Sequence, residues 1–366
     1  MTKPKLKGKV NYRYLRISGE LPLMLAAHFS LRSKRGSRRT LIINPCLIGD
    51  FISSVHALRH YINTHSASPD LVVSPAVKPL AERIRGIGSV FTDAELLASG
   101  KLGREYGTII MMRANSKALS FVRRARARKV ETSLMLMIKY ALHLADSMAR
   151  RKTPKQWREV NFEMIHASNR SLSFNNVFSF TEKDHADVRK LDALKTRDRI
   201  ILVHTESEWV MNRWDNRKWR LLLARINKLD GFRIVFIGGL GAKRDYEIIR
   251  RSMDFPVYSL IGAVNLRELA LVMRRSDYFI GVDSGPRNLA HLAGLRTIGL
   301  LGPGPHMFMP LSDKDIVLDK SDGRGLYERF FYRKDGLMNK ISVNDVYNAF
   351  LRLHSAAQRP VRRKIR

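Results

Sequence analysis

The chain of 366 residues is 45% hydrophobic and carries a formal net charge of +33. This composition excludes an intrinsically disordered protein, and the length is sufficient for two α/β domains with full cores. The single cysteine, Cys46, excludes an intrachain disulfide and a cysteine-based zinc site, and it favours a reducing, cytosolic type of compartment.

The positive charge is concentrated in three segments. Residues 1–40 balance to +10, residues 117–152 to +8 and residues 357–366 to +5, and together they supply +23 of the +33. A field of this strength attracts nucleic acids, anionic lipid headgroups or a phosphorylated glycolipid, unless the charge serves solubility alone. The charge by itself does not choose among these partners.

No apolar run reaches the roughly 18–20 residues that a membrane span requires. Residues 21–31 (LPLMLAAHFSL) are apolar but short, and Arg16 and Arg32 flank them. The segment lacks a small-residue cleavage site followed by a polar mature start, as a signal peptide would have. It predicts either an interfacial helix or a helix packed on its own domain.

Strands alternate with helices in the first half of the chain. Apolar runs predict strands at 41–44, 70–74 and 106–112, with helices at 51–61 and 76–85. This alternation predicts a parallel sheet with right-handed crossovers.

The character of the sequence changes from residue 113 onward. Residues 113–155 are expected to form a basic amphipathic insertion, which either lies against a membrane surface or packs inward with a solvated basic face. Its most basic part is FVRRARARK, with Arg123, Arg124, Arg126 and Arg128. Residues 156–197 read as irregular and polar and are expected to contain the interdomain connection.

The α/β alternation resumes after this connection. Strands are predicted at 198–204, 233–238, 257–260, 278–282 and 297–301, and helices at 219–229, 241–252, 266–274 and 343–353. Two domains of this kind place a cleft at the carboxyl ends of their strands, where ligands bind.

Residues 278–305 are the most informative stretch of the chain. A buried strand leads into Asp283-Ser284-Gly285-Pro286, a turn that also starts a helix. The free N–H groups and the dipole of a helix start at the end of a parallel strand favour a phosphate group. The segment therefore predicts a site for a phosphorylated ligand, although an ordinary strand–helix–strand unit has the same pattern.

Other candidate residues follow strands in the same way. Asp50 comes after a strand and a glycine-containing turn, where a carboxylate serves either as a general base or as a helix cap. Asp283 is a candidate acceptor of ribose or sugar hydroxyls or a helix cap, and Arg287 is a candidate cationic contact.

Two basic or glycine-rich loops complete the candidates. In the segment FIGGLG (236–241), Gly238 and Gly239 allow close approach of a ligand, although the full dinucleotide fingerprint is missing. Arg213, in the segment NRW (212–214), either neutralises a leaving diphosphate or belongs to a solvated basic loop.

Several of these segments together resemble glycosyltransferase family 9, the ADP-heptose:lipopolysaccharide heptosyltransferases. The similar segments are residues 42–61, 212–219, 233–245, 259–305 and 339–350, of which 259–305 is the most specific. The chain departs from the family at Asn212, where Lys is usual, and at Asn288, where His is usual. Cys46 and Leu47 replace the small hydroxyl residues that usually precede Gly-Asp.

The resemblance implies an α/β protein of the GT-B fold, with two Rossmann-like domains whose parallel sheets face a central cleft. The expected divisions are a basic extension (1–38), an acceptor domain (39–175), a nucleotide-sugar domain (176–340), and a C-terminal helix with a basic tail (341–366). The helix at 343–353 is expected to cross back to the first domain.

The resemblance also implies inverting sugar transfer without a metal or cofactor, with ADP-heptose as the expected donor. Asp50 would deprotonate the acceptor hydroxyl. The donor would contact Arg213, Gly238, Gly239, Asp283, Ser284, Gly285, Arg287 and Asn288.

The expected acceptor is a lipopolysaccharide core or another lipid-linked glycan. Arg123, Arg124, Arg126 and Arg128 are expected to face this acceptor or an anionic membrane, which implies a peripheral protein on the cytoplasmic face of the inner membrane. Two alternatives remain: a nucleic-acid-binding protein on a Rossmann-like scaffold, for which no motif appears, and a degenerate transferase homologue at the membrane.

Overall fold

The computed structural model describes residues 39–65, 68–100, 106–113, 121–122, 127, 129–132, 161, 163, 172–207, 210–302, 312–320 and 336–358. The expected basic extension with its helix at 21–31, the arginines Arg123, Arg124, Arg126 and Arg128, and the tail at 359–366 lie outside the described residues.

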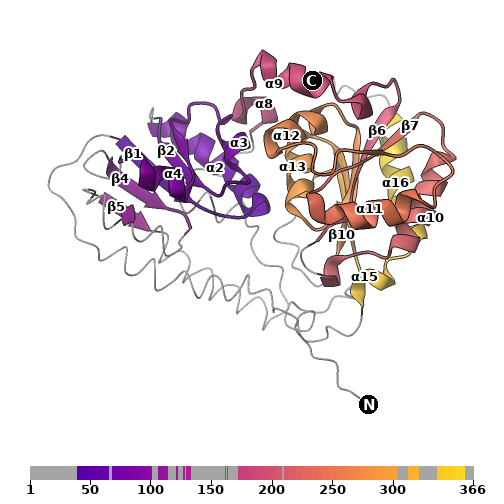
Figure 1. Ribbon diagram of the computed structural model, residues 1–366. Coiled ribbons are helices and arrows are strands. Elements are labelled where there is room, and N and C mark those ends of the chain that lie inside the picture. Colours follow the sequence, from indigo (N-terminus) through magenta and orange to yellow (C-terminus); the bar gives the residue numbers. More distant parts are fainter. Residues whose placement is uncertain are drawn as a thin grey trace, which may run out of the picture.

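Two parallel sheets form the framework of the molecule (Figure 1). The N-terminal sheet has the strand order β3-β2-β1-β4-β5. Its strands are β1 (Arg39–Asn44), β2 (Asp70–Val73), β3 (Val90–Phe91), β4 (Tyr106–Met111) and β5 (Lys129–Thr132). The strand order reverses between β1 and β4, and ligands of open α/β sheets bind outside such a point.

The C-terminal sheet has the order β11-β10-β9-β6-β7-β8 and reverses between β6 and β9. Its strands are β6 (Arg199–His204), β7 (Phe232–Phe236), β8 (Tyr258–Ser259), β9 (Tyr278–Val282), β10 (Arg296–Leu301) and β11 (Asp315–Asp319). The central strands β6 and β9 are almost wholly buried, as continuous apolar runs in parallel sheets are.

Helices cover both sheets and connect them. They are α2 (Ile48–His65), α3 (Lys78–Ala81), α4 (Asp93–Ala98), α8 (Phe174–Val177), α9 (Glu182–Arg189), α10 (Asn216–Asn227), α11 (Lys243–Arg250), α12 (Leu266–Arg274), α13 (Gly285–Ala293), α15 (Leu337–Lys340) and α16 (Val343–Gln358). Capping boxes begin α4, α9 and α12, where the side chain before the helix and an acidic side chain three residues later each bind a backbone N–H group.

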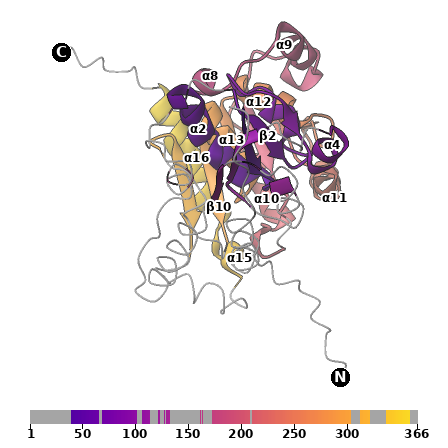
Figure 2. The ribbon, with the colours of Figure 1, turned by 90° about the vertical axis from the view of Figure 1, so that its left-hand side faces the viewer.

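The apolar core is continuous between the two sheets. One cluster joins the N-terminal sheet and α2 to α12 and α13, which lie between the sheets in Figure 1. In the view of Figure 2 the N-terminal lobe stands in front of these two helices. A second cluster fills the other face of the C-terminal sheet under α10 and α16. Phe350 and Ala349 of α16 are fully buried there, so the expectation that this helix crosses back to the first domain is wrong.

Two expectations about the middle of the chain are also corrected. Residues 129–132, expected within the basic insertion, form β5 and pair with β4, because Val130 fits the buried edge of the sheet. The stretch expected to be irregular contains α8 and α9, and α8 spans the expected domain boundary after residue 175. Polar composition concealed α9, which is held mainly by its cap and by ion pairs.

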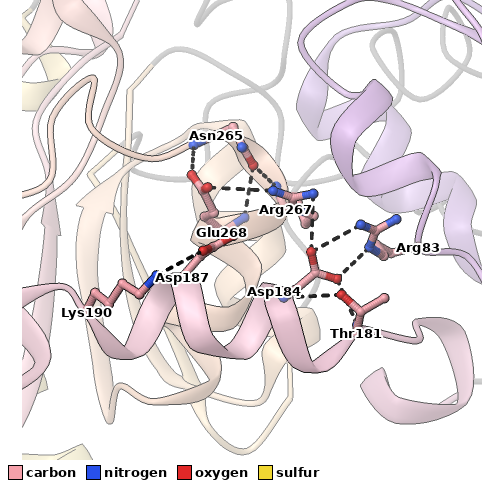
Figure 3. A network of polar contacts seen from close by, with 8 residues as sticks. All are labelled: Arg83, Thr181, Asp184, Asp187, Lys190, Asn265, Arg267 and Glu268. Carbon is pink, nitrogen blue, oxygen red and sulfur yellow. Dashed lines mark hydrogen bonds and ion pairs between the residues drawn. The ribbon is translucent and has the colours of Figure 1, made fainter.

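These ion pairs converge on Asp184 of α9, which links the two lobes (Figure 3). Its carboxylate accepts hydrogen bonds from Arg83, after α3, at 2.7 and 3.1 Å, and lies 3.2 Å from Arg267 of α12. Burial raises the pKa of this carboxyl, but the bonds from Arg83 and Thr181 outweigh that effect and hold the pKa well below its usual range. Asp184 therefore remains ionised and fixes α9 to both lobes.

Candidate active site

The starts of α2 and α13 are in backbone contact. A Cβ atom added to Gly285 would lie 2.8 Å from Cβ of Ile48 and 2.9 Å from the backbone nitrogen of Gly49. Only glycine fits at this approach without movement of the other helix. Each helix follows a central strand of its own sheet, so this contact brings the two reversal points together.

Asp50 lies in the first turn of α2, beside this contact. Its side chain is only 12% exposed, and its Oδ2 atom is 3.6 Å from Nη2 of Arg113, which is equally buried. This ion pair holds the carboxylate in place at the junction of the lobes. Asp50, which was expected to follow a strand, thus lies at the start of α2, next to the second lobe.

Sequence reasoning missed Arg113. The residue follows β4, whose Met111 pairs with Ile43 of β1, and the backbone N–H of Arg113 donates to the carbonyl of Ile43 at 3.2 Å. Because the carboxyl ends of adjacent parallel strands share one edge, a cation after β4 was a detectable partner for Asp50 after β1.

Ser284 precedes α13 with an extended backbone, and its side chain makes no capping hydrogen bond. Its Oγ atom is buried and has no hydrogen-bond partner within the described residues. The first turn of a helix also leaves backbone N–H groups without partners inside the helix. The start of α13 therefore offers a hydroxyl and backbone amides that can donate hydrogen bonds to an anion.

Arg287 has an ion-pair partner inside the C-terminal lobe. Its side chain is fully buried, and its Nη2 atom lies 3.3 Å from Oδ1 of Asp315 on β11. Asp315 also binds His291 at 2.8 Å and the hydroxyl of Thr297. This internal ion pair fixes α13 to the sheet, and the expected contact of Arg287 with a donor stays a prediction.

Several other polar side-chain atoms of the described C-terminal lobe are buried without a hydrogen-bond partner in the structure, and three of them lie at or after the end of β6: His204 Nδ1, Thr205 Oγ1 and Asn212 Oδ1. His204 ends β6, next to β9, and Thr205 follows it. Burial lowers the pKa of His204 to about 4, so its ring is neutral at pH 7. Buried polar groups are nearly always paired, so these three atoms are candidates for contact with a polar ligand.

The glycine-rich turn after β7 holds a carboxylate. The backbone N–H of Gly239 donates to Oε2 of Glu206 at 3.0 Å, and a Cβ atom added to Gly238 would lie 3.3 Å from the same oxygen. The Glu206 carboxylate therefore occupies the Gly239 amide, and the expected close approach of a ligand to these glycines stays a prediction. Glu206, two residues after β6, was not singled out from the sequence.

The remaining expected donor residues lie around α13 or on the loop after β6. Arg213 is exposed, and its Nε atom donates to the carbonyl of Ser207 at 2.9 Å. Asp283 is half-buried, and its backbone N–H donates to Leu300 at 3.0 Å. Asn288 is buried, with its Nδ2 atom 3.5 Å from the position of a Cβ on Gly49.

Two features are missing among the described residues, a metal site and a membrane-spanning helix. No group of three or more His, Cys, Asp or Glu side chains among them is arranged to hold a metal ion. None of the described helices is both long and apolar enough to cross a membrane.

Comparison with known proteins shows what the chain resembles. The family model described as glycosyltransferase family 9 (heptosyltransferase) matches residues 102–324. The lipopolysaccharide heptosyltransferase 3 of Escherichia coli (strain K12) is 28% identical over 132 residues. That match spans 35% of this chain and 38% of the relative's length.

Two solved structures share the fold. A glycosyl transferase family 9 protein from Veillonella parvula has a TM-score of 0.68 at 17% identity, covering 89% of this chain and 99% of its own. The E. coli ADP-heptose lps heptosyltransferase II has a TM-score of 0.68 at 15% identity, covering 88% of this chain and 100% of its own. These likenesses confirm the predicted α/β architecture of the GT-B type.

Proposed function

The chain belongs to glycosyltransferase family 9, and from this premise we propose that it transfers a heptose-like sugar from a nucleotide diphosphate to a lipopolysaccharide core or another lipid-linked glycan. The observation that carries the proposal is the contact of the two helix starts, in which Gly49, the neighbour of Asp50, lies against Gly285, the first residue of α13. We assign the proton acceptor to Asp50 and the anion site to the start of α13, two groups that glycosyl transfer needs close together.

In the proposed reaction Asp50 takes the proton from the acceptor hydroxyl. The hydroxyl oxygen then forms a bond to the anomeric carbon of the donor while the bond from that carbon to the diphosphate oxygen breaks. Attack from the face opposite the nucleotide inverts the configuration. The negative charge that develops on the diphosphate is stabilised by the N–H groups at the start of α13 and by the Ser284 hydroxyl.

The other donor contacts follow from charge. Glu206 repels phosphate but accepts hydrogen bonds from hydroxyl groups, so we assign it to the ribose or the sugar, with the glycine turn as its support. Neutral His204, Thr205 and Asn212 supply uncharged polar contacts. Arg213 is exposed and supplies a cation to the leaving diphosphate, which compensates for Asn212 at the usual lysine position.

We infer the class of acceptor from the net charge of the chain. Lys and Arg outnumber Asp and Glu by 66 to 33, and a phosphorylated glycolipid in an anionic bilayer is a polyanion of matching sign. We therefore propose peripheral binding to such membranes, with transfer at their surface. Binding to anionic vesicles should weaken as salt is raised.

The direct test is turnover of ADP-heptose with a lipopolysaccharide-core acceptor, preceded by melting curves with ADP, GDP, UDP and an oligonucleotide. A nucleoside diphosphate at 100 times its Kd is expected to add about 2.7 kcal/mol to the free energy of unfolding. Stabilisation by the oligonucleotide alone would support the nucleic-acid-binding alternative. Diphosphate binding without transfer to any lipid-linked glycan would support the degenerate homologue.

A further inference from the structure

A cavity of about 580 Å³ lies where the two lobes and their connection meet. Arg85 reaches it from the turn after α3, the α8–α9 segment supplies one wall, and Leu271, Arg274 and Arg275 reach it from the end of α12. Its volume falls within the range of sites for small molecules.

This cavity lies on the opposite edge of the sheets from Asp50. Arg274 and Arg275 end α12 and lead into the first residue of β9, and α9 leads toward the start of β6. The starts of parallel strands lie at the edge opposite to their carboxyl ends, where α2 and α13 begin. The cavity is therefore separate from the candidate active site.

The described lining is strongly cationic. It contains Arg85, Arg189, Arg274 and Arg275 together with His185, and it contains no Asp or Glu. Backbone carbonyls fix two of the guanidinium groups: Arg85 donates to Phe178 at 3.0 Å, and Arg274 donates to Ala293 at 3.0 Å. A guanidinium has five N–H donors, so each retains groups for an anion. Arg189 also pairs with the exposed carboxylate of Glu182, which lies outside the lining, and such an exposed pair is weak. The remaining guanidinium N–H groups of the four arginines favour a phosphate, which arginine binds in bidentate fashion.

Three phenylalanines make up most of the apolar lining, together with Val188 and Leu271. Phe174, Phe178 and Phe180 form a cluster with ring centroids 5.1 to 6.1 Å apart, and the guanidinium of Arg274 lies 5.4 Å from the ring of Phe174. His185 meets the half-buried ring of Phe180 edge-on. A flat ring on a ligand would pack against such a wall.

The wall is held in position before any ligand arrives. On α9, Val188 and Arg189 line the cavity, while Asp184 on the same helix is tied to Arg83 and Arg267 (Figure 3). Because the helix is anchored to both lobes, the cations and rings are preorganised, which lowers the entropic cost of binding.

We propose that this cavity binds a small phosphorylated molecule that carries a flat ring. Its phosphate contacts Arg85, Arg189 and Arg275, and its ring packs against the phenylalanine cluster. The site joins both lobes and lies outside the reaction proposed above.

Titration of naphthyl phosphate, followed by fluorescence anisotropy at about 0.15 M salt, where surface charges are screened beyond about 8 Å, tests this site. The double variant Arg189→Gln/Arg275→Gln is expected to raise the Kd by about tenfold or more, because two charge-assisted contacts are lost. The matched control is Arg220→Gln/Arg251→Gln, which removes the same charge from exposed arginines of α10 and of the residue after α11. It should change the Kd by less than about twofold.

Competition with naphthol and with inorganic phosphate separates the two halves of the ligand. Both should compete more weakly than naphthyl phosphate. Phe180→Leu should raise the Kd for naphthyl phosphate by about threefold or more and leave the binding of inorganic phosphate unchanged. An equal loss of affinity for naphthyl phosphate in the two double variants, or no loss in either, would overturn the proposed site. Competition by phosphate as strong as that by naphthyl phosphate would overturn the role of the ring.

Discussion

The two strand–helix units that meet in the candidate active site place their charges in opposite ways. In β1–α2, the charge of Asp50 lies at the junction of the lobes, next to Arg113. In β9–α13, the charge of Arg287 is turned inward to Asp315, and the junction receives backbone amides and the Ser284 hydroxyl. The same local fold therefore presents the Asp50 carboxylate from one lobe and, next to Asp283, backbone amides and a hydroxyl from the other.

This difference matches the two tasks of a group transfer. A proton acceptor needs a charged group at the reacting hydroxyl, whereas a leaving diphosphate is well served by fixed dipoles that need no reorganisation as charge develops. The inward ion pair of Arg287 with Asp315 fixes α13, and with it those dipoles, to the sheet. The comparison therefore predicts effects on turnover in the first unit and on stability in the second.

The largest effect is expected from Asp50→Asn. The amide cannot accept the proton from the hydroxyl, so turnover should fall by about 10² to 10⁴-fold. Donor binding depends on the other lobe and should persist. Initial rates of transfer and the melting shift caused by ADP measure the two properties on the same protein. Wild-type turnover in this variant would remove the proposed base and with it the functional difference between the units.

Arg287→Met tests the second unit. Loss of the guanidinium leaves the Asp315 carboxylate buried with fewer partners, which should lower the free energy of unfolding by about 3–5 kcal/mol. Urea unfolding at neutral pH measures this loss. The same measurement on Asp315→Asn and on the double variant completes a cycle, and additive effects would show that the two side chains do not act as a pair.

The alternation of elements could be predicted from the sequence because apolar runs and helix starts are local signals. The strand at 278–282 and the helix at 266–274 agree with the structure residue for residue. The strand β11 and the helix α9 were not predicted from the sequence. The apolar character of β11 is shared by core segments of any kind, and the polar character of α9 is shared by surface loops. Both are fixed by partners far away in the chain, Asp184 by Arg83 and β11 by β10.

The candidate site likewise combines features that local sequence predicts with features that depend on distant residues. Asp50 and Ser284 could be placed at helix starts from local sequence, because strand, turn and helix follow one another there. The inward rotation of Arg287 depends on Asp315, 28 residues later, and the carboxylate in the glycine turn depends on Glu206, 33 residues earlier. Such pairings are tertiary and carry no local signature.

A pH-dependent effect is expected from His204, beside the second unit. Its pKa is lowered to about 4 by burial, against an ordinary value of 6.5, so the unfolded chain binds a proton at a higher pH than the folded one. Its contribution to stability is complete above pH 6.5 and is lost as the pH falls toward 4, by about 3 kcal/mol in total.

His204→Gln should remove that loss, because glutamine does not titrate. Unfolding free energies of the two proteins, measured between pH 7.5 and 4.5, give the difference directly. Parallel curves would show that the His204 ring is accessible to protons in the folded state, and hence that this edge of the second lobe is less enclosed than its burial indicates.

The smallest effect is expected where the units touch. Gly285→Ala places a methyl group against Ile48 and the Gly49 backbone, and such overpacking costs about 1–3 kcal/mol. Gly49→Ala is the matched control, since its Cβ would meet Gly285 and Asn288 at 3.5 Å, an ordinary contact. Because the methyl at Gly285 also pushes Asp50 away from α13, its loss of turnover should exceed its loss of stability. Equal turnover in both variants would show that transfer does not depend on this helix contact.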